Sequence, residues 1–257
     1  SSALDFILPF EKYKITAGAK VSFTNTRNGI NYDTSDPTLV QDDYFRYKEQ
    51  IYALYADYSR EFSERFSMQL GLRMEHTRTT GISEAKDTED KHDYTRLFPT
   101  VYLLYSPTDG HALNFSFSNR ISRPSQNMVN PFPFYQNKYT YACGREDLKP
   151  SYTYNAELGY TLKNNFNVSA YYSYSDDVFF QVVDLDAETN VTSFLWENFM
   201  QTHAFGLNNS YTFRTKWLQA YAQHGVSYRR TTSSADHNPP QERGWAYADS
   251  TPQPLHF

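Results

Sequence analysis

The stretch FSMQLGLRMEH, residues 66–76, alternates strictly between apolar and polar side chains. Its apolar residues occupy the even positions from Phe66 to Met74, and its polar residues, including Arg73 and Glu75, occupy the odd positions. A period of two indicates a β-strand with two unlike faces. A soluble sheet would bury the apolar face in a core, whereas a membrane barrel would turn it toward lipid and keep the charged face inside.

The composition favours β-structure. Aromatic residues make up 18% of the 257 residues, with 23 Tyr and 19 Phe, and such residues are enriched in strands. The formal net charge of -5 and the lack of a compact Lys/Arg cluster argue against a nucleic-acid partner. A mean hydropathy of -0.71, with no apolar run of about 18 residues, argues against a transmembrane helix. The low mean hydropathy is still compatible with a membrane barrel, because only alternate residues of its strands meet lipid.

Residues with catalytic or metal-binding chemistry form no recognisable constellation. The single cysteine, Cys143, has no partner for an internal disulfide, and there is no CxxC or HxxxH spacing. The seven histidines are scattered without ligand spacing, and no nucleophile with an adjacent base can be assembled. We therefore expect no enzyme activity, no metal site and no cofactor.

Short and long connections alternate along the chain. Five tight hairpin turns are predicted at residues 9–13, 62–66, 106–111, 162–166 and 213–217. Longer polar loops are predicted at residues 27–43, 81–93, 122–150 and 231–244, with a milder break at 184–190. In an antiparallel meander alternate connections lie at the same end, so one end carries the turns and the other the loops. Outer-membrane barrels have this asymmetry.

Strand length agrees with a membrane wall. The nine alternating residues from Phe66 to Met74 span roughly 30 Å at about 3.3 Å per residue. Tilted by about 45°, they would cover just over 20 Å of an apolar band of roughly 25 Å. Residues 193–213 lose the alternation partway, which indicates a bulge. Aromatics flank most of the turns, either as a girdle at one membrane interface or as ordinary cross-hairpin pairs.

Residues 119–160 resemble the barrel of TonB-dependent receptors, especially the outer-membrane β-barrel proteins of that type common in Bacteroidetes. The shared motifs are SRP at 122–124, NPF at 130–132, Gly144, and LKP at 148–150. The sequence departs from the family pattern at Arg145 and Glu146, where Asn-Pro is usual, and at Ser151, where Glu is usual. Residues 47–79 also resemble the hairpins of this family.

The resemblance implies an all-β, antiparallel up-and-down transmembrane barrel of about 22 strands in the bacterial outer membrane. It also implies an N-terminal plug and uptake of a small ligand or nutrient, driven by TonB-type energy coupling through that plug. With about 10–11 strands visible, we expect residues 1–257 to be a truncated barrel segment that lacks the plug and the remaining strands. Outer-membrane lipid and the ligand are the expected partners. The alternative is a soluble β-sandwich or solenoid binding module, carbohydrate-directed given the tyrosines, with short strands and a second apolar layer over residues 66–74.

An aromatic cluster in the loop at residues 130–144 is the candidate ligand-contact site. Its members are Phe132, Phe134, Tyr135, Tyr139 and Tyr141. Exposed aromatic side chains can stack on a sugar, an aromatic chelator or a peptide. Alternatively, these side chains pack the loop onto itself or onto the barrel rim.

Overall fold

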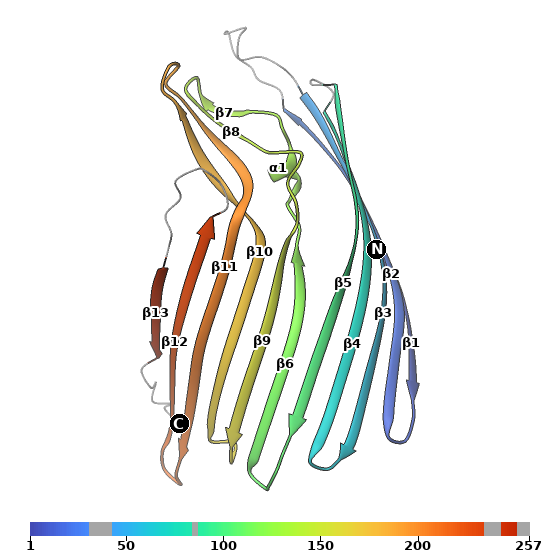
Figure 1. The fold of residues 1–257 in the computed structure, drawn as a ribbon, viewed down its shortest axis with the longest axis vertical. Coiled ribbons are helices and arrows are strands. Elements are labelled where there is room, and N and C mark those ends of the chain that lie inside the picture. The colour runs from blue at the N-terminus through green and yellow to red at the C-terminus, as the bar shows by residue number, and fades with distance from the viewer. Residues whose placement is uncertain (31–42, 84–86, 234–242, 251–257) are drawn as a thin grey trace.

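The computed structural model describes residues 1–30, 43–83, 87–233 and 243–250. In this part of the chain, eleven strands follow one another in a single sheet, each antiparallel to its neighbour in the sequence order (Figure 1). Two further short strands, β7 and β8, lie off this path. The predicted all-β meander of about 10–11 strands is confirmed.

The eleven strands of the wall are β1 (Ser2–Pro9), β2 (Tyr13–Ile30), β3 (Asp43–Ser63), β4 (Phe66–Ser83), β5 (Thr88–Tyr105), β6 (His111–Ser122), β9 (Ser151–Leu162), β10 (Phe166–Asp186), β11 (Val191–Arg214), β12 (Gln219–Ser233) and β13 (Arg243–Ser250). Between β6 and β9 lie α1 (Gln126–Val129), β7 (Phe134–Asn137) and β8 (Thr140–Cys143). All five predicted tight turns join consecutive strands at one end of the sheet, which we call the turn end; the opposite end is the loop end. No helix in the described part of the chain is long and apolar enough to cross a membrane.

The predicted loop at residues 81–93 is wrong in most of its length. Here β4 and β5 continue their pairing, with Gly81 opposite Asp90 and Ile82 opposite Glu89. Beyond the hydrocarbon the outer face of a hairpin meets water, so pairing there needs no apolar alternation. The 18 residues of β4 extend roughly 60 Å at about 3.4 Å per residue, well past an apolar band of roughly 25 Å. Residues 31–42, 84–86 and 234–242 of the predicted loops lie outside the described residues.

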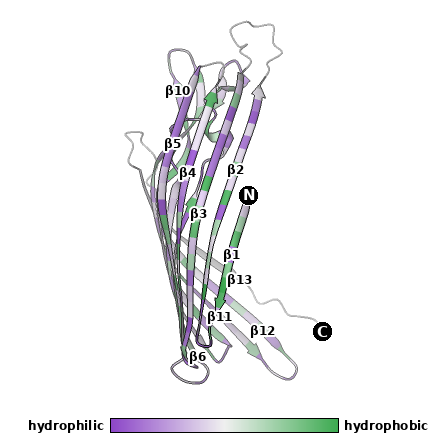
Figure 2. Cartoon of the chain, turned by 90° about the vertical axis from the view of Figure 1, so that its right-hand side faces the viewer, coloured by the Kyte–Doolittle hydropathy of each residue, from purple (hydrophilic) through white to green (hydrophobic). Residues whose placement is uncertain are grey.

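The two faces of β4 differ as the sequence predicts. Leu70, Leu72 and Met74 are 39%, 51% and 40% exposed, whereas Glu75 and Thr77 on the opposite face are 5% and 0% exposed. Within the described residues no second apolar layer covers the exposed side chains, so the sandwich or solenoid alternative is wrong. In Figure 2 β1 is largely hydrophobic in colour, and the loop ends of β4 and β5 are largely hydrophilic.

Two irregularities interrupt the pairing of β10 and β11. The register shifts between Ser175 and Val178 and again between Val178 and Phe179, which leaves extra residues on both strands. Asp177 adopts a φ of 51° at the first shift. The bulge predicted from the lost alternation of residues 193–213 is thereby confirmed, and it bends the loop end of this hairpin relative to its turn end.

Aromatic side chains gather at the turn end. Phe10 stacks on Tyr13 across the first turn with ring centroids 4.4 Å apart, and Phe62 contacts Phe66 across the second at 5.3 Å. Trp217, in the last of these turns, is 80% exposed. The aromatics therefore pair across hairpins and also form an exposed belt at one end of the wall, so the two interpretations are compatible.

Candidate ligand site inside the curved sheet

Residues 123–150, here called the interior segment, fold against the polar face of the sheet. The segment leaves the wall after Ser122 and returns at Ser151, and these two residues are paired in register between β6 and β9. It carries α1, β7 and β8, and β8 pairs in parallel with the loop half of β11. Figure 1 shows these elements near the loop end, between β5 and the β10–β11 hairpin.

Arg123 ties the start of the interior segment to the inner wall. Its Nη2 lies 2.5 Å from Glu75 Oε2 and 3.1 Å from Thr77 Oγ1, both on β4, and its Nε lies 3.8 Å from Glu49 Oε2 on β3. The Glu75 side chain is only 6% exposed, and it also pairs with Arg73. One guanidinium thus neutralises carboxylates of two neighbouring strands, which is what keeps a buried charge cluster tolerable.

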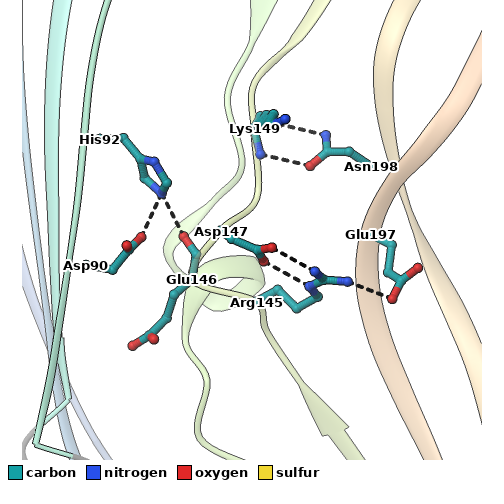
Figure 3. Close-up of polar contacts among 8 residues, drawn as sticks. All are labelled: Asp90, His92, Arg145, Glu146, Asp147, Lys149, Glu197 and Asn198. Atoms are coloured by element: carbon teal, nitrogen blue, oxygen red, sulfur yellow. Dashed lines mark hydrogen bonds and ion pairs between the residues drawn. The ribbon is translucent and has the colours of Figure 1, made fainter.

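A second arginine ties the end of the segment to the opposite wall (Figure 3). Arg145 donates to both carboxylate oxygens of Asp147, at 2.9 and 2.7 Å, and to Glu197 Oε1 of β11 at 2.7 Å. The hydrogen bond from Arg145 holds the pKa of the Asp147 carboxyl below its ordinary value. Arg145, which departs from the family pattern, therefore supplies the cation that joins the interior segment to β11.

Asn198 supports the same end of the segment through its carboxamide. Its Oδ1 accepts from Lys149 N–H at 2.8 Å, and its Nδ2 donates to the carbonyls of Lys149 at 2.9 Å and Asp177 at 2.7 Å. Asn198 lies at the bulge, where the local loss of strand pairing frees backbone groups. The Asn198 side chain thereby forms hydrogen bonds with backbone groups that a neighbouring strand would otherwise bond.

The third contact reaches β5. His92 Nε2 lies 2.9 Å from the carbonyl oxygen of Glu146 and 2.7 Å from Asp90 Oδ2. Thr88 donates its hydroxyl to Glu146 Oε1 at 3.0 Å. Residues 145–149 are therefore bonded to β5 on one side and to β11 on the other, and they bridge the interior of the curved sheet (Figure 3).

Apolar packing fixes the middle of the segment. Phe45 of β3, Val129 and Leu148 form a buried cluster at 1%, 7% and 5% exposure. Partly buried side chains from both walls surround it, including Phe179 and Trp196, whose rings meet edge to face at 6.3 Å. The interior segment is held by this core as well as by its polar contacts.

Beside this core, a cavity of about 470 Å³, here called the vestibule, lies between β2, the interior segment and β11. Its lining contains the carboxamides of Asn28, Asn127 and Asn130 and the rings of Phe132, Phe134 and Trp196. Gly144 completes the wall, and a Cβ there would lie 2.5 Å from the carbonyl oxygens of Asn130 and Met128. Only glycine lets the chain approach so closely. The volume is within the range of small-molecule pockets.

A second hollow of about 550 Å³, here called the lower groove, lies nearer the middle of the wall strands. Its lining includes the charged side chains of Lys20, Asp57, Arg73, Glu75 and Arg120. The two hollows thus differ in chemistry. The vestibule is lined by amides and aromatic rings, and the lower groove by charges of both signs.

The five aromatic residues that were predicted to contact a ligand form two groups. One group lines the vestibule, and the other packs within the loop or lies exposed. Phe132, 7% exposed, and Phe134, 55% exposed, line the vestibule. Tyr135 and Tyr141 pack on each other with ring centroids 5.5 Å apart, and Tyr139 is 51% exposed beside Lys138. Ligand contact by these residues stays a prediction.

Other lining residues were missed by reasoning from the sequence. Asn28 and Trp196 come from strands far from the loop in sequence, and no local pattern marks either of them. Asn127 and Asn130 lie in the predicted loop, but only its aromatic residues were considered. Among the residues that the structure describes, no group of three or more His, Cys, Asp or Glu side chains could hold a metal ion.

Comparisons with known proteins agree with this architecture. The sequence model described as "Outer membrane protein beta-barrel family" matches residues 1–251. A comparison with curated protein sequences finds no match. Among solved structures, the chain is similar to the copper transporter OprC, at 12% identity and a TM-score of 0.66, over 91% of this chain and 38% of that one.

Two more solved structures are similar at low identity. The FrpB iron transporter from Neisseria meningitidis (F5-1 variant) aligns at 14% identity and a TM-score of 0.55, over 93% of this chain and 37% of that one. The ferric yersiniabactin uptake receptor FyuA from Yersinia pestis aligns at 16% and 0.54, over 91% and 35%. At such identities the likeness shows the fold. The chain spans less than two fifths of the length of these proteins.

Proposed function

The chain belongs to the outer membrane protein β-barrel family, and from this premise we propose that it is part of a receptor that imports a small ligand or nutrient. The family places the chain in the bacterial outer membrane. The wall has the required polarity, with apolar side chains outward and charged side chains inward. The similar solved structures are named as transporters and receptors, and no enzyme activity is proposed for this chain.

The observation that carries the proposal is the interior segment. An open pore would have an unobstructed lumen, but residues 145–149 bridge the interior from β5 to β11, and the vestibule lies against the same segment. A wall with a fixed inner constriction and a ligand-sized cavity suits capture of a ligand better than passive diffusion. Binding followed by gated release is therefore the function that this geometry supports best.

We further propose that the eleven strands are a segment of a larger barrel with a plug, coupled to a TonB-type partner at the inner membrane. In the described sheet β1 and β13 each pair on one side only, and an unpaired strand edge is costly within a membrane. The mixed charges of the lower groove offer hydrogen-bonding and ionic partners for a plug surface. A Bacteroidetes origin is supported only by the sequence motifs.

Uptake by cells tests this proposal. Cells that produce the full-length protein should accumulate a labelled ligand, and a protonophore that collapses the inner-membrane potential should abolish accumulation while leaving surface binding intact. Candidate probes are a ferric chelate, a copper complex and a labelled oligosaccharide. Accumulation that survives the protonophore would contradict energy coupling. Full retention of every probe outside the cell would contradict transport.

A further inference from the structure

We propose that the vestibule binds a neutral carbohydrate, an inference that rests on the proposed receptor function and names its ligand class. The chemistry of the lining carries it. Three carboxamides, from Asn28, Asn127 and Asn130, lie around the same cavity as the rings of Phe134 and Trp196. A carboxamide carries two N–H donors and an acceptor oxygen, as sugar hydroxyl groups require, and aromatic faces stack on the apolar C–H faces of sugar rings. In Asn130 the oxygen already accepts a hydrogen bond from Phe132 N–H.

The charge of the lining separates carbohydrate from ferric chelates and other ions. Among the described residues, no Asp, Glu, Lys, Arg or His side chain lines the vestibule, although the lower groove is lined by five charged side chains. A charged ligand would lose water in the vestibule without gaining a counter-charge, and that loss is costly. A neutral ligand with many hydroxyl groups loses nothing comparable, because the amides replace its water.

The arrangement of the rings suits a sugar ring held between two walls. Phe134 lies on β7 and is 55% exposed, and Trp196 lies on β11, which pairs with β8 of the same small hairpin. Trp196 is held in place edge to face by Phe179 at 6.3 Å. One ring is thus fixed by the wall and the other is presented by the segment, and both line one cavity of about 470 Å³.

Backbone contacts hold the site in shape before any ligand arrives. Asn130 Oδ1 accepts from Phe132 N–H at 3.1 Å, and the Asn130 carbonyl accepts from Gly144 N–H at 2.8 Å. Met128 accepts from Arg145 N–H at 2.8 Å. A preformed site loses less conformational entropy on binding, which favours recognition of a weakly interacting ligand such as a sugar.

Calorimetric titration of the full-length protein in detergent micelles tests the ligand class. The probes are maltotriose, cellotriose, mannotriose and xylotriose, with ferric citrate as a charged comparison. We expect at least one trisaccharide to bind and ferric citrate not to compete with it. Phe134→Ala should weaken that binding about tenfold, and Asn127→Ala several-fold. Phe180→Ala is the matched control, because Phe180 is a phenylalanine of β10 that is 59% exposed and does not line the vestibule.

Several results would overturn the inference. They are failure of all four trisaccharides to bind at millimolar concentration, competition by ferric citrate, or an equal loss of affinity in Phe134→Ala and Phe180→Ala. Failure of the receptor proposal gives a different result. Energy-dependent uptake of a ferric chelate without sugar binding would keep the receptor and reject the ligand class. Sugar binding without uptake would keep the ligand class and reject transport.

Discussion

Replacement of Arg123 by Met should destabilise the protein far more than the same replacement at Arg78. Both arginines pair with carboxylates, Arg123 with Glu75 at 2.5 Å and Arg78 with Asp93 at 2.8 Å. The side chains of the first pair are 20% and 6% exposed, and those of the second are 60% and 54% exposed. Glu75 and Arg78 lie on the same strand, so the two pairs differ chiefly in burial.

The expected magnitudes follow from that difference. Arg123→Met leaves the carboxylates of Glu75 and Glu49 without their shared cation, and breaking a buried pair costs about 3–5 kcal/mol. Arg78→Met should cost at most about 1 kcal/mol, because water solvates the exposed Asp93 carboxylate. Glu75→Gln should cost less than Arg123→Met, since Arg123 then retains Glu49. In the double variant Arg123→Met/Glu75→Gln the losses should be less than additive.

The assay is guanidinium unfolding of the full-length protein in detergent micelles, followed by tryptophan fluorescence. If the free energy of unfolding falls with denaturant concentration at the same slope in all variants, a shift of the midpoint reports a change in the free energy of unfolding. If the Arg123→Met and Arg78→Met variants differ by less than about 1 kcal/mol, burial of the Arg123 cluster does not stabilise the segment, and the reasoning is refuted.

Three further predictions concern the wall, the segment and its charges. Leu72→Arg, on the lipid face, should lower the free energy of unfolding by about 2–4 kcal/mol, whereas Gln69→Arg, on the inner face of the same strand, should change it little. Equal folded fractions of the two variants in liposomes would contradict the lipid-facing assignment. Gly144→Ala should destabilise the protein by about 1–3 kcal/mol in thermal unfolding. Gly244→Ala, whose Cβ meets nothing within 4 Å, should leave the stability unchanged. Equal effects of the two variants would contradict the close approach of the backbone at Gly144. The lowered pKa of Asp147 means that its pairing with Arg145 stabilises the protein fully above the ordinary carboxyl pKa and is lost as the pH falls through the lowered value. A carbon-13 titration should give Asp147 a higher midpoint in Arg145→Met than in the unmodified protein, and unchanged midpoints would contradict this.

The wall was predictable because its signal is local. The alternation of residues 66–74 and the five short turns follow from neighbouring residues, and each turn is where the sequence places it. The length of the strands was not predictable in the same way. Outside the membrane residues 81–83 of β4 and 88–90 of β5 are held by backbone pairing in register, and period-two alternation is no longer required there.

The vestibule was only half predictable, because its lining combines distant parts of the chain. The sequence predicts Phe132 and Phe134 as members of one aromatic cluster, although Phe132 is buried. Asn28 and Trp196 join them only once the sheet curves and brings β2 and β11 to the same cavity. The bonds of Asn198 to Lys149 likewise depend on a bulge whose position, but not whose bonding, the sequence indicates.

The register pair of Ser122 and Ser151 has a consequence for how such a protein can change. Because the chain leaves the wall and re-enters it at directly opposed residues, the 28 residues between them do not determine the order of the eleven wall strands or the pairing of β6 with β9. A different detour of another length could be spliced between the same two serines without moving β6 or β9. The wall would then stay constant among related proteins, and ligand preference could change by exchange of the interior segment alone.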